Sequence, residues 1–595
     1  MDQLTPAQAK EQLLADLSLE LMRQHVEHIA LRIPSRAAGS ASGRRMADYS
    51  CQQLLKAGAQ TAQVHEVHAL VSFPLHAELR VDAPVQFVIQ ANTLGHSAAT
   101  ADEGLSGELV YLAAGTRDEF EATDVKGKIV LTELGYAPAR HEKQRLARKH
   151  GALACVMLNW GPDDSVAVPY GSVKPGWGTP TLDSPAEETQ TIPCVGISRA
   201  SGLALRRLCG ARPVKVWLRT HVENAWHPVH VTLGAVCAPR GPESDDFVLV
   251  GGHQDSWPGP AATDNAAGSA CLLELARVFA KHRSRLRRSL KFGFWAAHET
   301  GTMAGSTWFA DHHWDELREH ACAYLQIDQP GCAGTTEWES ASSAEMRAMH
   351  EPEEAAQLAG VERHWRAIVK NGDASFIGLG LPMMNAQGSF TPAELAASAQ
   401  ASLGWWHHSD ACTLDKVDAH WLWCHSRVYA AYLWELCTAP ILPFTFSPVA
   451  AQLAARLREL EPMGRGIDLA RLVRRADAVL DLAEKFDALV LDTRARFDSA
   501  GCDEAVAARL NATIKRLSRL FNPLLYSTKS RYEHDSYGHT AQAHLLPGLY
   551  ELPRLEGTRK EDEHAMLLTA LSRQRNRVSD GLDDLSVLLM QALKT

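Results

Sequence analysis

The stretch DDFVLVGGHQDSWPGPAATDNAAGSACLLELARVFAKH (245–282) decides the fold of this chain. It starts with a nearly continuous apolar run, DDFVLVGGH (245–253), which is typical of a strand that a sheet buries on both faces. ACLLELARVFAKH (270–282) has the pattern of a helix, and LKFGFWAAH (290–298) repeats the buried-strand pattern. Strand, helix and strand in this order predict a βαβ unit and therefore an α/β fold.

The regions around this unit differ in pattern. From 228 to 440 strands and helices continue to alternate, whereas residues 100–222 hold short strands with turn signals. Residues beyond about 446 are helical. We predict a mostly parallel, mixed sheet flanked by helices, with a β-rich insert and a C-terminal helical domain. The predicted boundaries are 1–95 and 223–445 for the main domain, 96–222 for the insert and 446–595 for the helical domain.

Length and composition agree with this division. At 595 residues the chain is too long for a single core, and 46% hydrophobic with 22% charged residues is an ordinary globular composition. The formal net charge is −10 and no long run of Lys or Arg occurs, so we expect no nucleic-acid partner. No stretch reaches the roughly 18 uninterrupted apolar residues that cross a bilayer, so we expect no membrane span.

The N-terminus and the cysteines bear on location. MDQLTPAQAKEQLLADLSLELM (1–22) lacks the basic start and the apolar core of a secretory signal. The 12 cysteines are scattered, form no CxxC pair and mostly stand in apolar runs, which favours buried reduced thiols. We therefore expect a cytoplasmic protein.

Side chains suited to metal binding follow the buried strands. His253 and Asp255 end the first strand, where open α/β sheets place their sites, and Asp264 stands at the start of the next helix. Taken alone, this segment leaves two interpretations open, because Asp264 is also a favourable helix cap and His253 an ordinary loop histidine. His298 and Glu299 end the second strand, where charged groups after an apolar run need a partner.

Two further positions complete the set. Asp328 ends the strand CAYLQIDQ (322–329), and His408 lies in the loop GWWHHSDACTLDKVD (404–418). Two histidines and three carboxylates suit two divalent ions, because one carboxylate can bridge both and imidazole with carboxylate fits Zn²⁺. The residues therefore predict a two-metal site at the carboxyl ends of the strands.

These residues and their order resemble the co-catalytic zinc aminopeptidases and carboxypeptidases of the M28 type. That family has an H-x-D strand end, a D-N-A-x-G helix start, a Glu-Glu pair before Gly-Ser, an Asp after a strand and a final His before Thr-Leu-Asp. The corresponding residues here are His253 and Asp255, Asp264-Asn265-Ala266-x-Gly268, His298-Glu299 before Gly305-Ser306, Asp328, and His408 before Thr413-Leu414-Asp415. The resemblance covers most of the chain.

The resemblance implies a role for each of these residues. Asp264 would bridge both ions, His253 and Asp328 would complete one metal site, and Glu299 and His408 would complete the other. The implied cofactors are two divalent metal ions, with Zn²⁺ expected and Mn²⁺ or Co²⁺ as alternatives. Asp255 is expected to hold the imidazole of His253, and we count it with the catalytic residues.

Four residues are candidates for binding the substrate, which we expect to be a small peptide or amide. NGDASFIGLGLP (371–382) resembles the family segment that lines the site, and it supplies Asp373 and Phe376. Trp406 and His407 stand directly before the last expected ligand, where they either face the substrate or simply pack beside that ligand.

Two other regions carry resemblances. KGKIVL (126–131), GALACVML (151–158) and IPCVGISRASGLAL (192–205) are similar to a protease-associated domain inserted into the peptidase domain. NPLLY (522–526) and LPGLY (546–550) are similar to segments of the helical dimerisation domain of the glutamate carboxypeptidase and transferrin receptor group. This second resemblance implies a homodimer.

The chain departs from the family at one catalytic position. The first Glu of the family's Glu-Glu pair is the general base, and His298 stands there. Three interpretations are open. His298 is the base, since the ordinary histidine pKa near 6.5 suits proton transfer; or the protein binds metal without hydrolysing peptides; or His298 is an extra ligand for a different metal-assisted reaction.

The complete set of expected ligands favours catalysis over a binding role. We predict a di-metal metallohydrolase of the M28 peptidase type, aminopeptidase-like or an amidohydrolase. It would cleave an amide or peptide bond by metal-activated water, with His298 in the general-base position. The alternative is a metal-binding non-peptidase, either a scaffold or binding protein or an enzyme of different metal-assisted chemistry.

Overall fold

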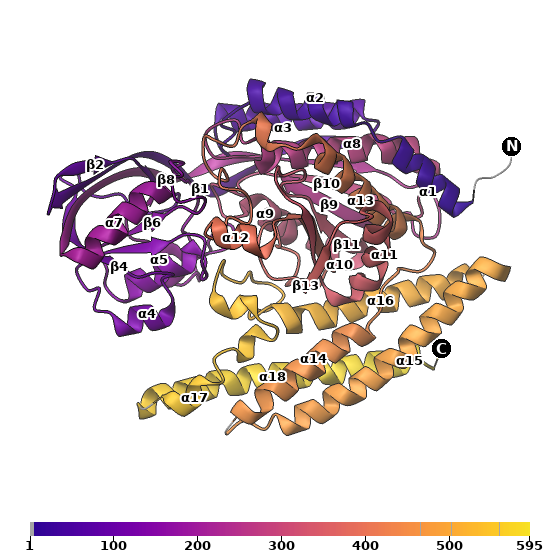
Figure 1. Ribbon diagram of the computed structural model, residues 1–595. Coiled ribbons are helices and arrows are strands. Elements are labelled where there is room, and N and C mark those ends of the chain that lie inside the picture. The colour runs from indigo at the N-terminus through magenta and orange to yellow at the C-terminus, as the bar shows by residue number, and fades with distance from the viewer. Residues whose placement is uncertain (1–4, 465, 501–502, 559, 595) are drawn as a thin grey trace.

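The computed structural model describes residues 5–464, 466–500, 503–558 and 560–594. Figure 1 shows a main lobe, a smaller lobe joined to it, and a layer of long helices beneath the main lobe. Two long strands connect the lobes, β1 (Thr61–Ala83) and β8 (Val214–Val236). The predicted fold class is confirmed, because a mixed, mostly parallel sheet with flanking helices carries both an insert and a helical C-terminal region.

The main lobe is built on a parallel centre. Its four parallel strands are, in spatial order, β10 (Ser289–Trp295), β9 (Phe247–His253), β11 (Ala321–Gln326) and β14 (Met383–Ser389). β9 and β11 are buried along their whole length, as their apolar sequences predict. β12 (Glu337–Ser342) pairs antiparallel with β14, and β13 (Arg363–Ala367) pairs parallel with β12 at the edge.

The order of these strands in the chain creates a crevice. The connection from β9 to β10 runs through α8 (Ala267–Lys281), and that from β10 to β11 runs through α9 (Ala304–His312) and α10 (Trp314–His320). Since β10 and β11 lie on opposite sides of β9, right-handed crossovers place α8 and α9 on opposite faces of the sheet. At such a reversal the carboxyl ends of the strands border a crevice, which is where ligands bind in open α/β sheets.

The main lobe has further helices. They are α1 (Pro6–Ala15), α2 (Leu19–Arg32), α3 (Ala41–Lys56), α11 (Arg347–Gln357), α12 (Pro392–Ala397) and α13 (Ala419–Thr438). α1 begins with a capping box, in which the Thr5 side chain accepts from the Gln8 amide and the Gln8 side chain accepts from the Thr5 amide. α8 is the most central helix, with 12 of its 15 residues buried.

The smaller lobe is an insert that begins within β1 and ends within β8 (Figure 1). These strands pair antiparallel along both lobes, with a register shift between Pro74 and His76. The lobe's other elements are β2 (Phe87–Ile89), β3 (Ala91–Thr93), β4 (Leu105–Tyr111), α4 (Arg117–Ala122), β5 (Ile129–Glu133), α5 (Arg140–Lys149), β6 (Ala154–Leu158), α6 (Ala186–Thr189), β7 (Cys194–Ile197) and α7 (Arg199–Ala211). The expected boundary at residue 95 assigned β2 and β3 to the main domain, whereas they pair with β1 and β7. A continuous strand gives no sequence signal for where it passes from one lobe to the other.

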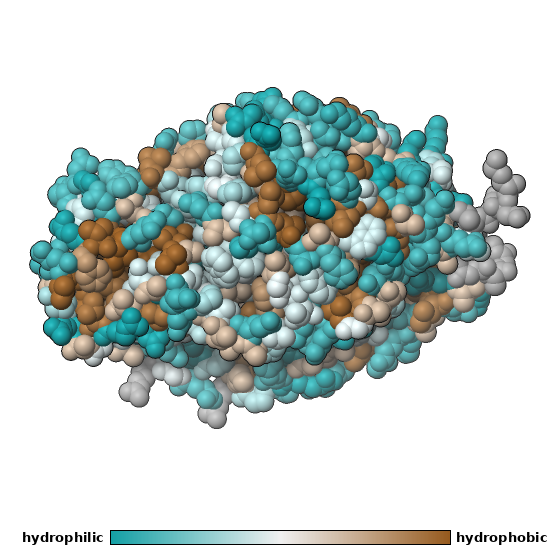
Figure 2. All heavy atoms as spheres, turned by 45° about the horizontal axis from the view of Figure 1, so that its top comes forward, coloured by the Kyte–Doolittle hydropathy of each residue, from teal (hydrophilic) through white to brown (hydrophobic). Residues whose placement is uncertain are grey.

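The C-terminal region is a layer of helices. They are α14 (Ser447–Leu460), α15 (Ala470–Ala500), α16 (Glu504–Tyr526), α17 (Arg554–Gly557) and α18 (Glu561–Ala592). No helix among the described residues is both long and apolar enough to cross a membrane. Figure 2 shows a largely hydrophilic face, with hydrophobic side chains gathered over the insert and near the centre.

Candidate metal centre and active site

Five side chains meet at the carboxyl ends of the central strands. They are His253 at the end of β9, Asp264 in the turn before α8, Glu299 in the loop after β10, Asp328 after β11, and His408 in the loop before α13. Gly252 allows the strand ends to approach, because a Cβ there would lie 2.3 Å from the main-chain oxygen of Ile327. This close approach brings the residue after Ile327, Asp328, beside His253.

Asp264 lies between two groups of these side chains. The Nε2 atom of His253 is 3.1 Å from Oδ1 of Asp264 and 3.3 Å from Oδ1 of Asp328. The Nε2 atom of His408 is 3.4 Å from Oδ2 of Asp264 and 3.0 Å from Oε1 of Glu299. Each oxygen of Asp264 therefore faces a different group, which is the arrangement of a carboxylate that bridges two cations.

The atoms in this cluster need cations. Nδ1 of His253 donates to the main-chain oxygen of Asp255 at 3.0 Å, so its Nε2 presents a lone pair. That Nε2, Oδ1 of Asp328 and Oε1 of Glu299 are buried without a hydrogen-bond partner. Acceptor atoms that face one another in a buried site repel one another unless a proton or a metal cation lies between them. Imidazole and carboxylate donors fit divalent zinc, so the residues present fit a pair of such ions.

Burial shifts the pKa values of both ligands at one side of the cluster. It lowers the pKa of His408 to about 3, so the ring is neutral, which is the form that coordinates a metal. Burial, followed by the charge of Asp264, raises the pKa of Glu299 to about 7. The carboxylate of Glu299 is thus costly to ionise without a cation nearby.

Neighbouring groups orient the cluster. Trp257 donates from Nε1 to Oε2 of Glu299 at 2.7 Å, which leaves Oε1 facing His408. The main-chain amide of Tyr170, a residue of the insert, donates to the main-chain oxygen of His408 at 2.7 Å. The insert therefore helps to hold the loop that carries His408. Sequence reasoning missed both residues, although Trp257 stands only four positions after His253.

Asp255 acts differently from the expectation. Its carboxylate lies 3.9 Å from Nδ1 of His253, and that nitrogen is bonded instead to the main-chain oxygen of Asp255. The two carboxylate oxygens accept the main-chain amides of His298 at 3.1 Å and Glu299 at 3.2 Å. The carboxylate of Asp255 thus positions the loop after β10, and only its main-chain oxygen holds the imidazole of His253.

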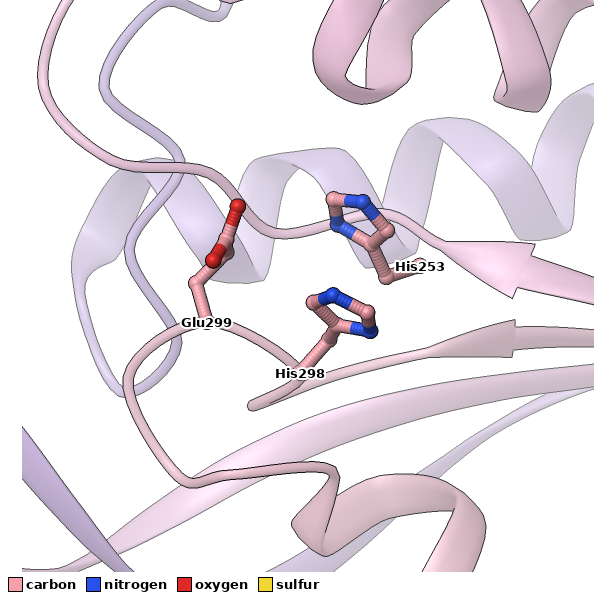
Figure 3. A group of neighbouring side chains, drawn as sticks. All are labelled: His253, His298 and Glu299. Atoms are coloured by element: carbon pink, nitrogen blue, oxygen red, sulfur yellow. The ribbon is translucent and has the colours of Figure 1, made fainter. Parts of the chain in front are cut away.

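His298 faces the same cluster. Figure 3 shows its ring alongside that of His253, with Glu299 pointing toward the same space, and the two rings stack at 4.0 Å and 12°. Nδ1 of His298 lies 2.9 Å from Oδ2 of Asp373, and since a carboxylate only accepts, this nitrogen donates. Nε2 is therefore the ring nitrogen left for proton transfer. Burial and the charge of His253 lower the pKa of His298, but Asp373 outweighs them and raises that pKa to about 9, so the ring is protonated at neutral pH until neighbouring cations lower its pKa.

Asp373 is held in turn by the main lobe. Its Oδ1 accepts from the hydroxyl of Ser306, at the start of α9, at 2.6 Å. The side chain is fully buried. Asp373 therefore orients His298 and does not contact the substrate cavity, which differs from the expectation that it binds substrate.

Of the other three expected substrate-binding residues, one lines the cavity and two do not. His407 lines the cavity, stacks on His408 at 3.7 Å and places Nδ1 3.2 Å from Oδ2 of Asp264. Phe376 does not line it, because it is fully buried and packs edge-on against Tyr324 in the core. Trp406 is also buried and lies in a small apolar cluster away from the cavity lining. Large apolar side chains in these two loops are core residues.

A cavity of about 280 Å³ lies above the cluster. The main lobe contributes polar side chains to its wall, which are Gln326, Gln329, Arg366, Asn371, Asn385 and Gln387. The insert contributes Arg140, His141 and Trp160, and the loop after α16 contributes Tyr537. Nothing in the sequence linked these four residues to the metal cluster, because they come from distant segments. A larger cavity of about 760 Å³ adjoins the first and shares Ala139, Asn371 and Tyr537 with it.

Two parts of the chain match known domain families. Residues 235–433, which contain all five side chains of the cluster, match the sequence profile of peptidase family M28. Residues 105–205, within the insert, match that of the PA domain.

Individual aminopeptidases are also similar to this chain. The chain is 25% identical over 413 residues to the probable lipoprotein aminopeptidase LpqL of Mycobacterium tuberculosis, covering 64% of this chain and 77% of LpqL. It is 29% identical over 248 residues to aminopeptidase YwaD of Bacillus subtilis, covering 41% of this chain and 48% of YwaD, so it spans about half of that relative. The solved structure of a zinc aminopeptidase from Bacillus subtilis superposes with a TM-score of 0.55 at 19% identity, over 72% of this chain and 97% of that one, which shows the shared fold.

Proposed function

We propose that this chain, whose residues 235–433 belong to peptidase family M28, is a two-metal aminopeptidase-like hydrolase acting on short peptides. The observation that carries the proposal is Asp264, whose two oxygens face two separate groups of ligand atoms, each of which includes a buried atom without a hydrogen-bond partner. In one group are His253 and Asp328, and in the other Glu299 and His408. Burying these facing ligand atoms at the base of a cavity costs free energy, and a scaffold protein would gain nothing that offsets this cost.

The five side chains would hold the ions, and His298 would manage the proton. Two divalent ions bound there, with zinc as the first expectation, would polarise the substrate carbonyl and acidify the attacking water. Nε2 of His298 would accept a proton from that water and pass it to the leaving amine. Asp373 fixes the ring so that Nε2 faces the cavity, and its charge stabilises the imidazolium that forms. A His-Asp pair thus takes the place of the family's single carboxylate base.

The names of LpqL and YwaD support the removal of residues from the N-terminus of a peptide. The cavity of about 280 Å³ supports a short substrate, and the adjoining cavity would receive the rest of a longer one. Because the wall of the first cavity is mostly polar, we expect specificity to depend on hydrogen bonds more than on a deep apolar pocket.

Metal analysis and a substrate panel test the proposal. We expect about two equivalents of zinc per chain and hydrolysis of aminoacyl-amide or dipeptide substrates that stops with a chelator and returns with added Zn²⁺, Mn²⁺ or Co²⁺. Absence of metal together with no activation by any of these ions would refute the two-metal site. A fully loaded protein that hydrolyses none of the panel would favour a binding role.

We also propose that two copies associate through residues 446–595. The resemblance of 522–526 and 546–550 to segments of a helical dimerisation domain supports this proposal. Sedimentation should then give twice the chain mass of 65.1 kDa. A monomer at micromolar concentration would contradict it.

A further inference from the structure

A third cavity, of about 420 Å³, lies between the main lobe and the C-terminal helices. Four arginines line it: Arg318 of α10, Arg516 and Arg519 of α16, and Arg531 of the loop after α16. Asp584 of α18 is the single carboxylate among its described lining residues, so the lining carries an excess of three positive charges. None of these residues lines the metal-site cavity.

Carboxylates do not neutralise these arginines. In the described part of the chain, none of the four forms an ion pair with a carboxylate within 4.0 Å. Arg519 donates to the main-chain oxygens of Leu317 at 3.0 Å and Ala321 at 3.1 Å, and Arg318 donates to that of Leu379 at 3.1 Å. Main-chain oxygens fix the guanidinium groups of Arg318 and Arg519 in place without removing their charge.

Three of the arginines, Arg318, Arg519 and Arg531, are close enough for neighbouring charges to repel one another. Burial lowers the pKa of Arg519 to about 10, and the charge of Arg318 adds to this effect. Burial likewise lowers the pKa of Arg318, and the charge of Arg531 adds to it. Asp246, whose charge favours Arg519, is itself bound by Lys515 at 2.7 Å. Like charges gathered around a cavity cost free energy unless an anion lies among them.

We propose that this cavity binds a small molecule that carries a phosphate or diphosphate group. Guanidinium groups form paired, charge-assisted hydrogen bonds with phosphate oxygens, and several of them together match a group with at least two negative charges. A single carboxylate would balance only one of the three excess charges. Leu520, Val587 and Leu588 form an apolar part of the lining, which leaves room for the organic part of the ligand.

Calorimetric titration of inorganic pyrophosphate into the full chain tests the proposal. The test variant is Arg516→Ala/Arg531→Ala, which removes two exposed arginines, and the matched control is Arg474→Ala, an exposed arginine of α15 outside the cavity. We expect the control to bind as the unaltered chain does, and the double variant to bind at least about tenfold more weakly for each lost guanidinium. Pyrophosphate held at the metal site contributes equally in all three proteins. Equal binding by the double variant would overturn the proposal.

Two further measurements separate a ligand site from other roles. Without anion, the double variant should melt at the same temperature as the unaltered chain or higher, because it loses mutual repulsion. A lower melting temperature would show that the arginines stabilise the fold, and would overturn the proposal. Dissociation of a dimer by the double variant, with no pyrophosphate binding by the unaltered chain, would also overturn it, because the arginines would then contact a second copy.

Discussion

The floor and the roof of the active-site cavity are built in different ways. The floor consists of the five candidate metal ligands, His253, Asp264, Glu299, Asp328 and His408, all within the 235–433 region. The roof consists of Arg140, His141 and Trp160 from the insert and Tyr537 from the C-terminal region. The difference teaches that metal chemistry depends on short motifs at strand ends, whereas the space open to a substrate depends on how three distant segments meet.

Removing the centre of the floor should have the largest effect. Asp264→Ala deletes the carboxylate that faces both groups of ligand atoms, so neither metal position keeps its set. We expect bound metal to fall from about two equivalents to below one, and kcat/KM to fall about 10³–10⁵-fold, since Lewis-acid and water activation are lost together. Metal analysis and steady-state kinetics measure both quantities.

Asp415→Ala is the matched control, because that carboxylate is 65% exposed and stands beside the loop of His408. It should keep both metal and turnover. If Asp264→Ala retained two ions and full activity, the floor would not be a metal site.

Replacing the proposed base should leave the floor intact and still slow the reaction. His298→Ala should lower kcat about 10²–10⁴-fold with metal content unchanged. His298→Glu restores the family's residue type, but its carboxylate would lie beside Asp373, which is 2.9 Å from the present imidazole. We expect that single change to stay slow and the pair His298→Glu/Asp373→Asn to recover roughly 2–150-fold, as expected for two coupled residues.

A double-mutant cycle on kcat measures this coupling. His312→Ala, an exposed histidine of α9, is the control for loss of an imidazole and should have no effect. Unchanged turnover in His298→Ala would remove His298 from the mechanism.

Asp373→Asn alone should have a smaller effect than loss of the base. The amide keeps the size of the side chain but no longer stabilises an imidazolium, and it allows the ring to turn. We expect kcat to fall about 10²-fold with KM nearly unchanged, since misplacement of a catalytic group has an effect of this size. A rise in KM at constant kcat would instead assign Asp373 to substrate binding.

Four residues of the floor could be predicted from the sequence because each follows an apolar strand or begins the following helix, whereas His408 lies in a loop and was implied by the M28 resemblance. The apolar pattern predicts the strands, and their parallel arrangement brings their carboxyl ends together. Histidine and carboxylate side chains at those ends then indicate a metal site. His298 stands out for the same reason, because it follows an apolar strand at the position where the M28 family has a Glu.

The rest of the site could not be predicted because it depends on contacts between distant segments. Phe376 and Asp373 stand three residues apart in one loop, yet one is a core residue and the other orients His298. Local sequence does not tell these roles apart, since the partner Ser306 lies 67 positions away from Asp373. The sequence of β1 likewise does not show where the strand passes from the main lobe into the insert, because its alternating pattern continues through both.

Changing the roof should have the smallest effect and should leave the chemistry alone. Tyr537 lines the cavity and packs at 4.1 Å against His141, but it contacts none of the floor residues by a hydrogen bond in the described chain. Tyr537→Ala should raise KM about 2–10-fold, as expected for a lost aromatic contact, with kcat and metal content unchanged. Tyr537→Phe keeps the ring and should bind substrate nearly as the unaltered chain does. A loss of metal or a large fall in kcat in Tyr537→Ala would mean that the roof supports the ligands, and that floor and roof do not act separately.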